Sequence, residues 1–120
     1  MQFDFAGEKP LFLQVADEIE DAIFTGAFPE ETQVPSTTEI SVTYKINPAT
    51  VLKGMNRLVE SGFLYKKRGV GMFVQSGAVG EIRKKRQTEF SKNYVEKLIE
   101  EAKKLGLTKT ELIELIERGM

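Results

Sequence analysis

The sequence contains neither cysteine nor histidine. Without cysteine the chain has no disulfide framework, no thiolate nucleophile and no zinc ribbon. Without histidine it lacks the commonest general base and the commonest transition-metal ligand. The remaining residues form no recognisable catalytic constellation. We therefore expect a protein that is not an enzyme and that uses no metal and no cofactor.

Long apolar runs are missing as well. No stretch approaches the roughly 20 apolar residues that a membrane-spanning helix needs. Asp4 and Glu8 interrupt the N-terminal segment, which argues against a signal peptide. The 120 residues, 41% hydrophobic and 29% charged, are enough for one small globular domain and an appendage. We expect a cytoplasmic protein without membrane partners.

The net charge of −1 conceals an uneven distribution along the chain. Residues 1–32 hold one cation and eight acids, a net charge of −7. Residues 33–76 hold six cations and two acids, a net of +4, and residues 77–120 hold ten cations and eight acids, a net of +2. A basic middle segment is typical of a protein that binds nucleic acid locally.

The stretch over residues 47–60 predicts an amphipathic helix around which the chain is organised. Asn47 is a typical N-cap residue, and Pro48 suits the first helical position. One side of this helix is apolar, with Val51, Met55 and Leu58. The other side carries short polar and cationic groups and no acid: Ala49, Thr50, Lys53, Asn56 and Arg57. Such a face suits a DNA major groove, although the helix alone also fits an ordinary surface helix.

The segments before this helix complete a helix-turn-helix candidate. Apolar residues at helical spacing predict a core helix from residue 11 to about 26, and residues 2–5 alternate like a short strand. Ser36 and Glu39 form a capping-box pattern that opens a short helix reaching about Tyr44. The brief connection through Lys45 to the helix at Asn47 is typical of this motif.

A basic hairpin is predicted directly after the second helix. Residues 63–67 and 72–75 read as strands, joined by a glycine-flanked turn at residues 68–71. Lys66, Lys67 and Arg68 concentrate positive charge at its tip. A charged edge hairpin can simply prevent aggregation. Its place after a helix-turn-helix favours a wing that touches phosphate or the minor groove.

The tail has a different composition from the rest of the chain. It reads as a linker at Ser76, a long charged helix from Ile82 to about Leu105, and a final helix opened by Thr108. Two such helices cannot enclose a core alone, and a DNA reader gains affinity by dimerising, so we favour packing on a second copy over packing on the winged domain. The predicted dimer interface is Phe90, Tyr94, Val95, Leu98, Ile99, Ala102, Leu105, Leu112, Ile113 and Ile116.

These patterns predict a mainly α fold with a small β-hairpin. The winged helix-turn-helix DNA-binding domain would cover residues 1–76, and a C-terminal two-helix dimerisation segment would cover residues 77–120. The predicted core of the winged domain is Val15, Ile19, Ile23, Val51, Leu58, Leu64 and Val74.

Over residues 10–74 the chain resembles the N-terminal winged helix-turn-helix domain of the GntR family of bacterial regulators. The joint order and spacing of five landmarks carry the resemblance: Pro10-Leu11-Phe12-Leu13-Gln14-Val15, Val34-Pro35-Ser36, Asn47-Pro48-Ala49-Thr50-Val51, Leu58-Val59-Glu60-Ser61-Gly62-Phe63-Leu64 and Gly69-Val70-Gly71-Met72-Phe73-Val74. The Asn-Pro opening and the brief tail are similar to the short YtrA subfamily. The resemblance implies a homodimeric repressor of a palindromic double-stranded operator, with its recognition helix beginning at Asn47.

The predicted DNA-binding residues are Ser36, Thr37, Thr38, Asn47, Pro48, Ala49, Thr50, Lys53, Asn56, Arg57, Lys67, Arg68, Gly69 and Val70. The chain departs from the family at Thr38 and Pro48, where many members carry arginine, and at Leu52, where a polar or basic residue is common. Base readout is therefore expected to rest on Thr50, Ala49 and Asn56, together with Lys53, and Arg57 would meet a phosphate or a protein acid.

The main alternative is a winged-helix module for protein–protein assembly without specific DNA binding. The missing arginines favour it, whereas the basic wing and the acid-free helix face oppose it. Larger family members hold an effector in a C-terminal domain, for which this tail is too short. A small-molecule effector, if one exists, would therefore sit between subunits.

Overall fold

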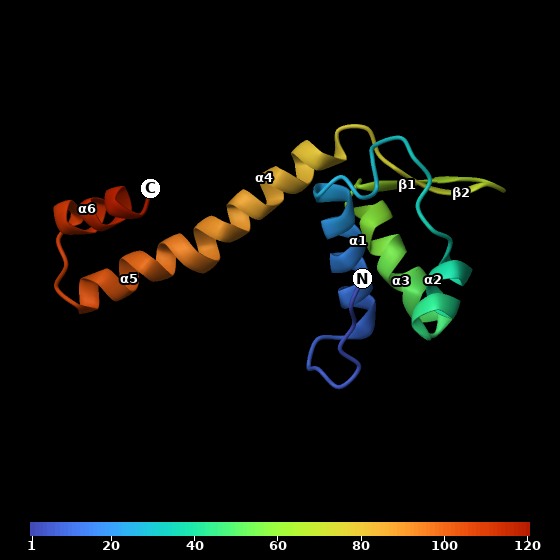
Figure 1. Cartoon of the computed structure of the whole chain (residues 1–120), viewed down its shortest axis with the longest axis horizontal. Coiled ribbons are helices and arrows are strands. Elements are labelled where there is room, and N and C mark those ends of the chain that lie inside the picture. The colour runs from blue at the N-terminus through green and yellow to red at the C-terminus, as the bar shows by residue number, and fades with distance from the viewer. The chain divides into compact units, whose positions relative to one another are not determined.

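The computed structural model describes residues 1–120 and divides them into two compact units, Met1–Arg83 and Lys84–Met120. The first unit contains three helices and a hairpin (Figure 1): α1 (Leu11–Phe24), α2 (Thr37–Tyr44), α3 (Pro48–Glu60), β1 (Leu64–Lys67) and β2 (Gly71–Val74). The remaining elements are α4 (Ala78–Phe90), which crosses the boundary, the π-helical turn η1 (Ser91–Val95), α5 (Glu96–Lys104) and α6 (Lys109–Gly119). The predicted fold class, a winged helix-turn-helix followed by C-terminal helices, is confirmed.

The core of the first unit lies where α1 packs against α3. Every predicted core residue is buried to within 2% exposure: Val15, Ile19, Ile23, Val51, Leu58, Leu64 and Val74. Gly54 allows the two helices to approach closely, because a Cβ atom there would lie 2.6 Å from the carbonyl oxygen of Phe12. The close approach fixes the position of the first turn of α1 against the middle of α3.

The connection from α2 to α3 is tight. The Ser36 hydroxyl accepts a hydrogen bond from the Glu39 N–H at 3.0 Å, and the Glu39 carboxylate accepts one from the Ser36 N–H at 3.2 Å. The predicted capping box is therefore confirmed. Lys45 ends α2 in the left-handed conformation with φ 55°, which turns the chain sharply before Asn47. This turn sets the angle between the two helices of the motif.

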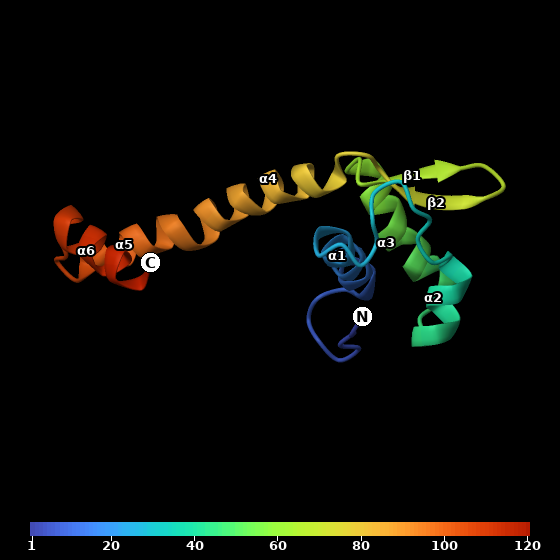
Figure 2. The same ribbon diagram turned by 45° about the horizontal axis from the view of Figure 1, so that its top comes forward.

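The hairpin is held by a third segment of chain. β1 and β2 pair antiparallel from Leu64 opposite Val74 to Lys67 opposite Gly71 (Figure 2). The connection between α1 and α2 adds backbone bonds to β2, including one from the Val34 N–H to the Met72 carbonyl at 3.0 Å. Nε2 of Gln33 donates to the carbonyl of Val70 at 2.9 Å, which ties this connection to the turn of the hairpin.

α4 begins earlier than the predicted start at Ile82. Ala78 and Ile82 are both buried in the core of the first unit, which stabilises the additional turn of helix. The Glu30 carboxylate also accepts hydrogen bonds from the N–H groups of Gly77 at 2.8 Å and Val79 at 3.1 Å. Free N–H groups at a helix start need such acceptors. This cap could not be predicted from the sequence, because Glu30 belongs to a loop far from α4 in the chain.

Glu30→Gln should lower stability in a pH-dependent way. The hydrogen bonds from Gly77 and then Val79 hold the pKa of Glu30 below its ordinary value of 4.5. Because this pKa is lowered on folding, the Glu30 carboxylate contributes its full stabilisation at pH values above the pKa that Glu30 has in the unfolded chain. The contribution disappears as the pH falls through the pKa that Glu30 has in the folded protein. Urea unfolding should therefore separate wild type from variant at pH 7, and the difference should shrink as the pH falls through the folded-state pKa of Glu30. Glu114→Gln, an equal charge change on α6, is the matched control; a pH-independent difference for Glu30→Gln would contradict the cap.

The predicted strand at residues 2–5 is wrong. The N-terminal segment contains no strand and lies on the helices. The ring of Phe3 meets that of Tyr44 edge-on, with centroids 5.2 Å apart. The Asp4 N–H donates to Oε1 of Gln14 at 2.8 Å. The Phe3 ring and the Asp4 N–H group are therefore engaged by contacts with α2 and α1, so they are not available for pairing in a β-sheet.

The second unit consists of a helical hairpin. The predicted continuous helix from Ile82 to Leu105 contains a π-helical turn at Ser91–Val95, which separates α4 from α5. Gly106, with φ 70°, allows the chain to turn after α5, and Thr108 opens α6 as predicted, through a capping box with Glu111. Ala102 is buried, whereas most other large apolar side chains of this unit are exposed. None of the helices has the length and apolar character needed to cross a membrane.

Candidate nucleic-acid interface

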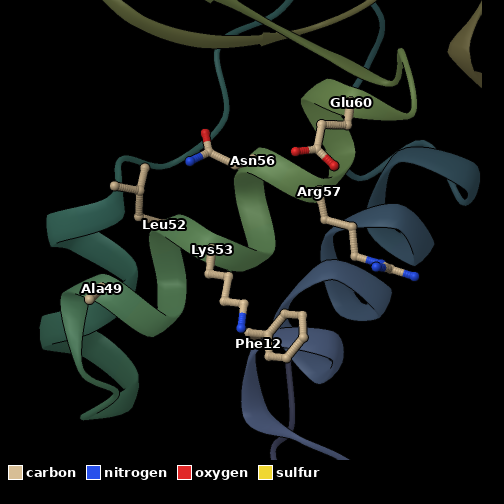
Figure 3. A pocket seen from close by; sticks show the side chains of 7 residues that line it. All are labelled: Phe12, Ala49, Leu52, Lys53, Asn56, Arg57 and Glu60. Atoms are coloured by element: carbon tan, nitrogen blue, oxygen red, sulfur yellow. The ribbon is translucent and has the colours of Figure 1, made fainter.

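The outward face of α3 is hollowed into a groove of about 400 Å³. Figure 3 shows its lining, which comes from α3 with one residue of α1: Ala49, Leu52, Lys53, Asn56, Arg57, Glu60 and Phe12. Four of the predicted DNA-binding residues therefore share one surface, since Ala49, Lys53, Asn56 and Arg57 all line it. The helix directs its apolar side to the core, which leaves this opposite side free for a ligand.

Lys53 is held in place by an aromatic ring. Its Nζ lies 4.0 Å from the centroid of the Phe12 ring (Figure 3). At an exposed site such a cation–π contact contributes about 0.5–1 kcal/mol. Phe12 is not among the predicted site residues, because its apolar character is that of any residue of the first helix that faces the core. The contact restricts where the ammonium group can reach.

Asn56 has unused hydrogen-bonding capacity. Its Oδ1 atom is buried and has no hydrogen-bond partner. Most buried polar side-chain atoms in proteins are paired, so an orphaned amide oxygen carries a free-energy cost. Rotation of the side chain toward a bound partner would relieve that cost. A paired carboxamide is the group that reads adenine in the major groove.

Glu60 corrects the expectation that this face carries no acid. It lines the C-terminal end of the groove, on the same side as Asn56 and Arg57. A carboxylate repels phosphate, so the negative charge disfavours close approach of DNA at this end. The acid-free part of the face is the first two turns of α3, around Ala49 and Lys53.

Several predicted contact residues also have structural roles. Oδ1 of Asn47 accepts a hydrogen bond from the Ala49 N–H at 2.8 Å and caps α3, as Ser36 caps α2. The Thr37 hydroxyl donates to the sulfur of Met55 at 3.6 Å. Thr38 and Pro48 are exposed, and Thr50 is half-buried. A cap occupies one acceptor and leaves the other groups of these residues available.

The tip of the hairpin presents its predicted contact residues to solvent. Lys67, Arg68, Gly69 and Val70 are all exposed. Nζ of Lys67 lies 5.2 Å from the centroid of the Phe73 ring, so this cation is directed back along the hairpin. Arg68 stands at the turn itself, which Gln33 anchors through the carbonyl of Val70. The sequence did not single out Gln33.

The second unit contains an apolar groove of about 440 Å³ between α5 and α6. Most of the predicted interface residues line it: Val95, Leu98, Ile99, Ala102, Leu112, Ile113 and Ile116. Phe90, Tyr94 and Leu105 lie outside the groove and are exposed. The rings of Phe90 and Tyr94 contact each other at a centroid distance of 5.5 Å. The unit thus leaves a large apolar face without a partner inside it.

A capped helix-turn-helix, an exposed groove on its second helix and a basic hairpin after it define a winged helix-turn-helix DNA-binding protein. The chain belongs to the gntR family of bacterial regulatory proteins, whose family model matches residues 11–74. This family comprises transcriptional regulators and not enzymes, in agreement with the expectation from the sequence.

Three known proteins illustrate the relationship. The uncharacterised HTH-type transcriptional regulator YhcF of Bacillus subtilis is 29% identical over 98% of this chain and 95% of its own length. YtrA of Sulfolobus acidocaldarius, a GntR-family transcription factor, superposes with a TM-score of 0.60 at 24% identity, covering 98% of this chain and 94% of that one. The AraR DNA-binding domain, crystallised with operator ORR3, gives a TM-score of 0.53 at 29% identity, covering 62% and 92%. The full-length matches agree with the short YtrA-like architecture.

Proposed function

We propose that this chain is a homodimeric repressor that binds a palindromic operator in the cytoplasm. The observation that carries the proposal is the exposed groove on α3, which gathers Ala49, Lys53 and Asn56 on the side away from the core. An α-helix fits the major groove, and its N-terminal residues make the base contacts in this motif. The AraR domain, which is similar to the first unit, was crystallised with its operator.

Each group of predicted contact residues takes a role suited to its chemistry. Thr50, Ala49, Asn56 and Lys53 face base edges, and Arg57 meets the backbone. At the start of the two helices the contacts to phosphate come from N–H groups and small side chains, namely Ser36, Thr37, Thr38, Asn47 and Pro48. The wing residues Lys67, Arg68, Gly69 and Val70 follow the adjacent backbone or minor groove.

The apolar groove of the second unit is the proposed dimer surface. Leu98, Ile99 and Ile113 are each more than 40% exposed there, an arrangement that is unfavourable for an isolated chain in water. A second copy would cover these side chains by a symmetric contact. Residues 77–120 would then form the dimerisation segment and residues 1–76 the DNA-binding domain, although the first turns of α4 pack in the core of the first unit. Repression requires only that the bound dimer occludes the promoter.

The salt dependence of DNA binding tests the proposal against the assembly-module alternative. A protein that neutralises Z phosphates loses affinity linearly in log salt, with a slope of about −0.9Z on duplex DNA. We expect such a slope on a duplex taken from the promoter of the chain's own operon. An assembly module would give no measurable slope, and that result would reject the proposed function.

Arg68→Ala should weaken binding to all duplex sequences alike. A phosphate contact carries no sequence information, so operator and random DNA lose the same factor. The slope of log affinity against log salt should decrease by about one unit for each phosphate contact removed. Fluorescence anisotropy at several salt concentrations measures both quantities. Arg118→Ala removes an exposed arginine at the end of α6 and is the matched control. A slope that Arg68→Ala leaves unchanged would exclude contact between Arg68 and phosphate.

A further inference from the structure

Leu52 is a large apolar side chain on the polar face of α3. It is 41% exposed and belongs to no buried cluster, although α3 has a well-packed core side. In Figure 3 it projects from the outward face of the helix, in the same row as Asn56 and one turn beyond Ala49. Because the core does not use this side chain, its isobutyl group is available to whatever occupies the groove.

Only one base offers an apolar group to such a side chain. In the major groove, guanine, adenine and cytosine present hydrogen-bond donors and acceptors, whereas thymine adds the C5-methyl group. An alkyl side chain placed against the polar edge of a base would displace water without replacing the hydrogen bonds that the water makes to that base. The C5-methyl group of thymine loses nothing by this contact and gains burial.

We propose that Leu52 is a specificity-determining residue that selects thymine through its C5-methyl group. This inference rests on the proposed function, since it requires α3 to lie in the major groove. It also explains how the recognition face can work without guanine-reading arginines. An alkyl contact at Leu52 replaces a polar readout at this position, and the amide of Asn56 lies next to it in the groove.

The expected effect follows from the burial of one methyl group. Removing that methyl from the DNA should weaken binding about fourfold at one half-site and about 15-fold at both half-sites of a palindrome. The base pairing of the duplex is unchanged when thymine is replaced by uracil, so the comparison isolates the methyl group. Specificity at other positions should be unaffected.

The experiment is a selection from random duplex libraries with the full-length protein. One library is synthesised with thymidine and the other with deoxyuridine in its place. We expect the thymidine library to yield a site with an invariant thymine in each half, and the deoxyuridine library to lose the preference at that position alone. Anisotropy titrations of the selected duplex, with thymine or uracil at that position, then measure the fold-change.

Variants of the protein assign the preference to the residue. Leu52→Ala should remove the difference between thymine and uracil, and Leu52→Met, which keeps a long apolar side chain, should retain most of it. Leu115→Ala makes the same exchange at a leucine of similar exposure, 48%, on α6, and should change nothing. Since Leu52 is exposed, its replacement should leave the thermal unfolding temperature close to that of wild type.

The outcomes separate the inference from the proposed function. Retained selection of uracil at that position in the deoxyuridine library, or a difference in affinity between thymine and uracil that persists in Leu52→Ala, would overturn the role of Leu52 while leaving operator binding intact. A selected site with no thymine preference in either half would do the same. Failure of both libraries to yield any enriched sequence would overturn the proposed function itself, and the inference with it.

Discussion

Leu98→Glu is expected to convert the dimer into a monomer. Leu98 lies in the apolar groove between α5 and α6, which Val95 of η1 and Ala102 of α5 also line. In an isolated chain the side chain is 43% exposed, so a carboxylate there would remain hydrated. In the proposed dimer the same carboxylate would be taken out of water among the apolar side chains of the groove in each subunit, and only Lys103 and Lys109 at its lining carry positive charge. Desolvation of a charge costs several kcal/mol, which corresponds to several decades in the dimer dissociation constant.

Sedimentation velocity measures this effect directly. Wild type should sediment as a dimer and Leu98→Glu as a monomer at the same micromolar concentration. Leu115→Glu is the matched control, because Leu115 is equally exposed on α6 but does not line the groove. Leu115→Glu should remain dimeric. A dimer that persists in Leu98→Glu would show that subunits associate through another surface.

The loss of the dimer should also reduce affinity for the operator. The first unit has its own core, which includes Val15, Ile19 and Val51, so it should stay folded in the monomeric variant. Each monomer would then bind one half-site without the linkage that joins two binding events. Operator affinity should approach that for random DNA, while far-UV circular dichroism stays close to wild type. Unchanged operator binding by a proven monomer would contradict the palindromic mode of recognition.

Local sequence signals were sufficient for most of the fold. The spacing of Ile19, Ile23 and their neighbours determines which side of α1 is buried, since a helix has only one arrangement that hides them together. The helix caps at Ser36 and Asn47 depend on hydrogen bonds to residues no more than three positions away. Both partners of each cap therefore lie in one short sequence motif. The hairpin follows from two short apolar segments around a glycine-flanked turn.

Contacts between distant segments could not be predicted from the sequence. Glu30 caps α4 and Gln33 anchors the hairpin turn, but each side chain looks like an ordinary loop residue in the sequence. The cation–π contact of Lys53 with Phe12 depends on the close approach that Gly54 allows. For the candidate site, helical periodicity predicts which residues lie on the outward face of α3. The contribution of Phe12 could not be predicted, because it depends on how α1 packs against α3.

Two predictions from local sequence patterns are wrong. Alternation over four residues suggested a strand at the N-terminus, but a strand needs a neighbour with free backbone groups, and Phe3 packs on Tyr44 instead. The prediction that the DNA-facing side of this helix carries no acid omits Glu60, although its spacing of four residues from Asn56 places both on one side. In the helix it lies one turn beyond Asn56 and faces the same groove.

Thr50→Ala and Asn56→Ala should reduce specificity more than affinity for DNA in general. Thr50 is in the first turn of α3, and Asn56 lines the groove with an unpaired amide oxygen. A hydrogen bond to a base edge contributes about 1–3 kcal/mol of discrimination, which a dimer uses in both half-sites. Each variant should therefore lose at least tenfold in operator affinity and little on random duplex.

Competition titrations with operator and random DNA at one fixed salt concentration measure that ratio. Asn93→Ala makes the same exchange as Asn56→Ala at an exposed asparagine of the π-helical turn, outside α3. It should leave the ratio unchanged. Alanine has a higher helix propensity than threonine or asparagine, so loss of the helix cannot account for a weakened variant. An equal loss on both DNAs would mean that Thr50 and Asn56 contact the backbone and that the operator is read by other residues of α3.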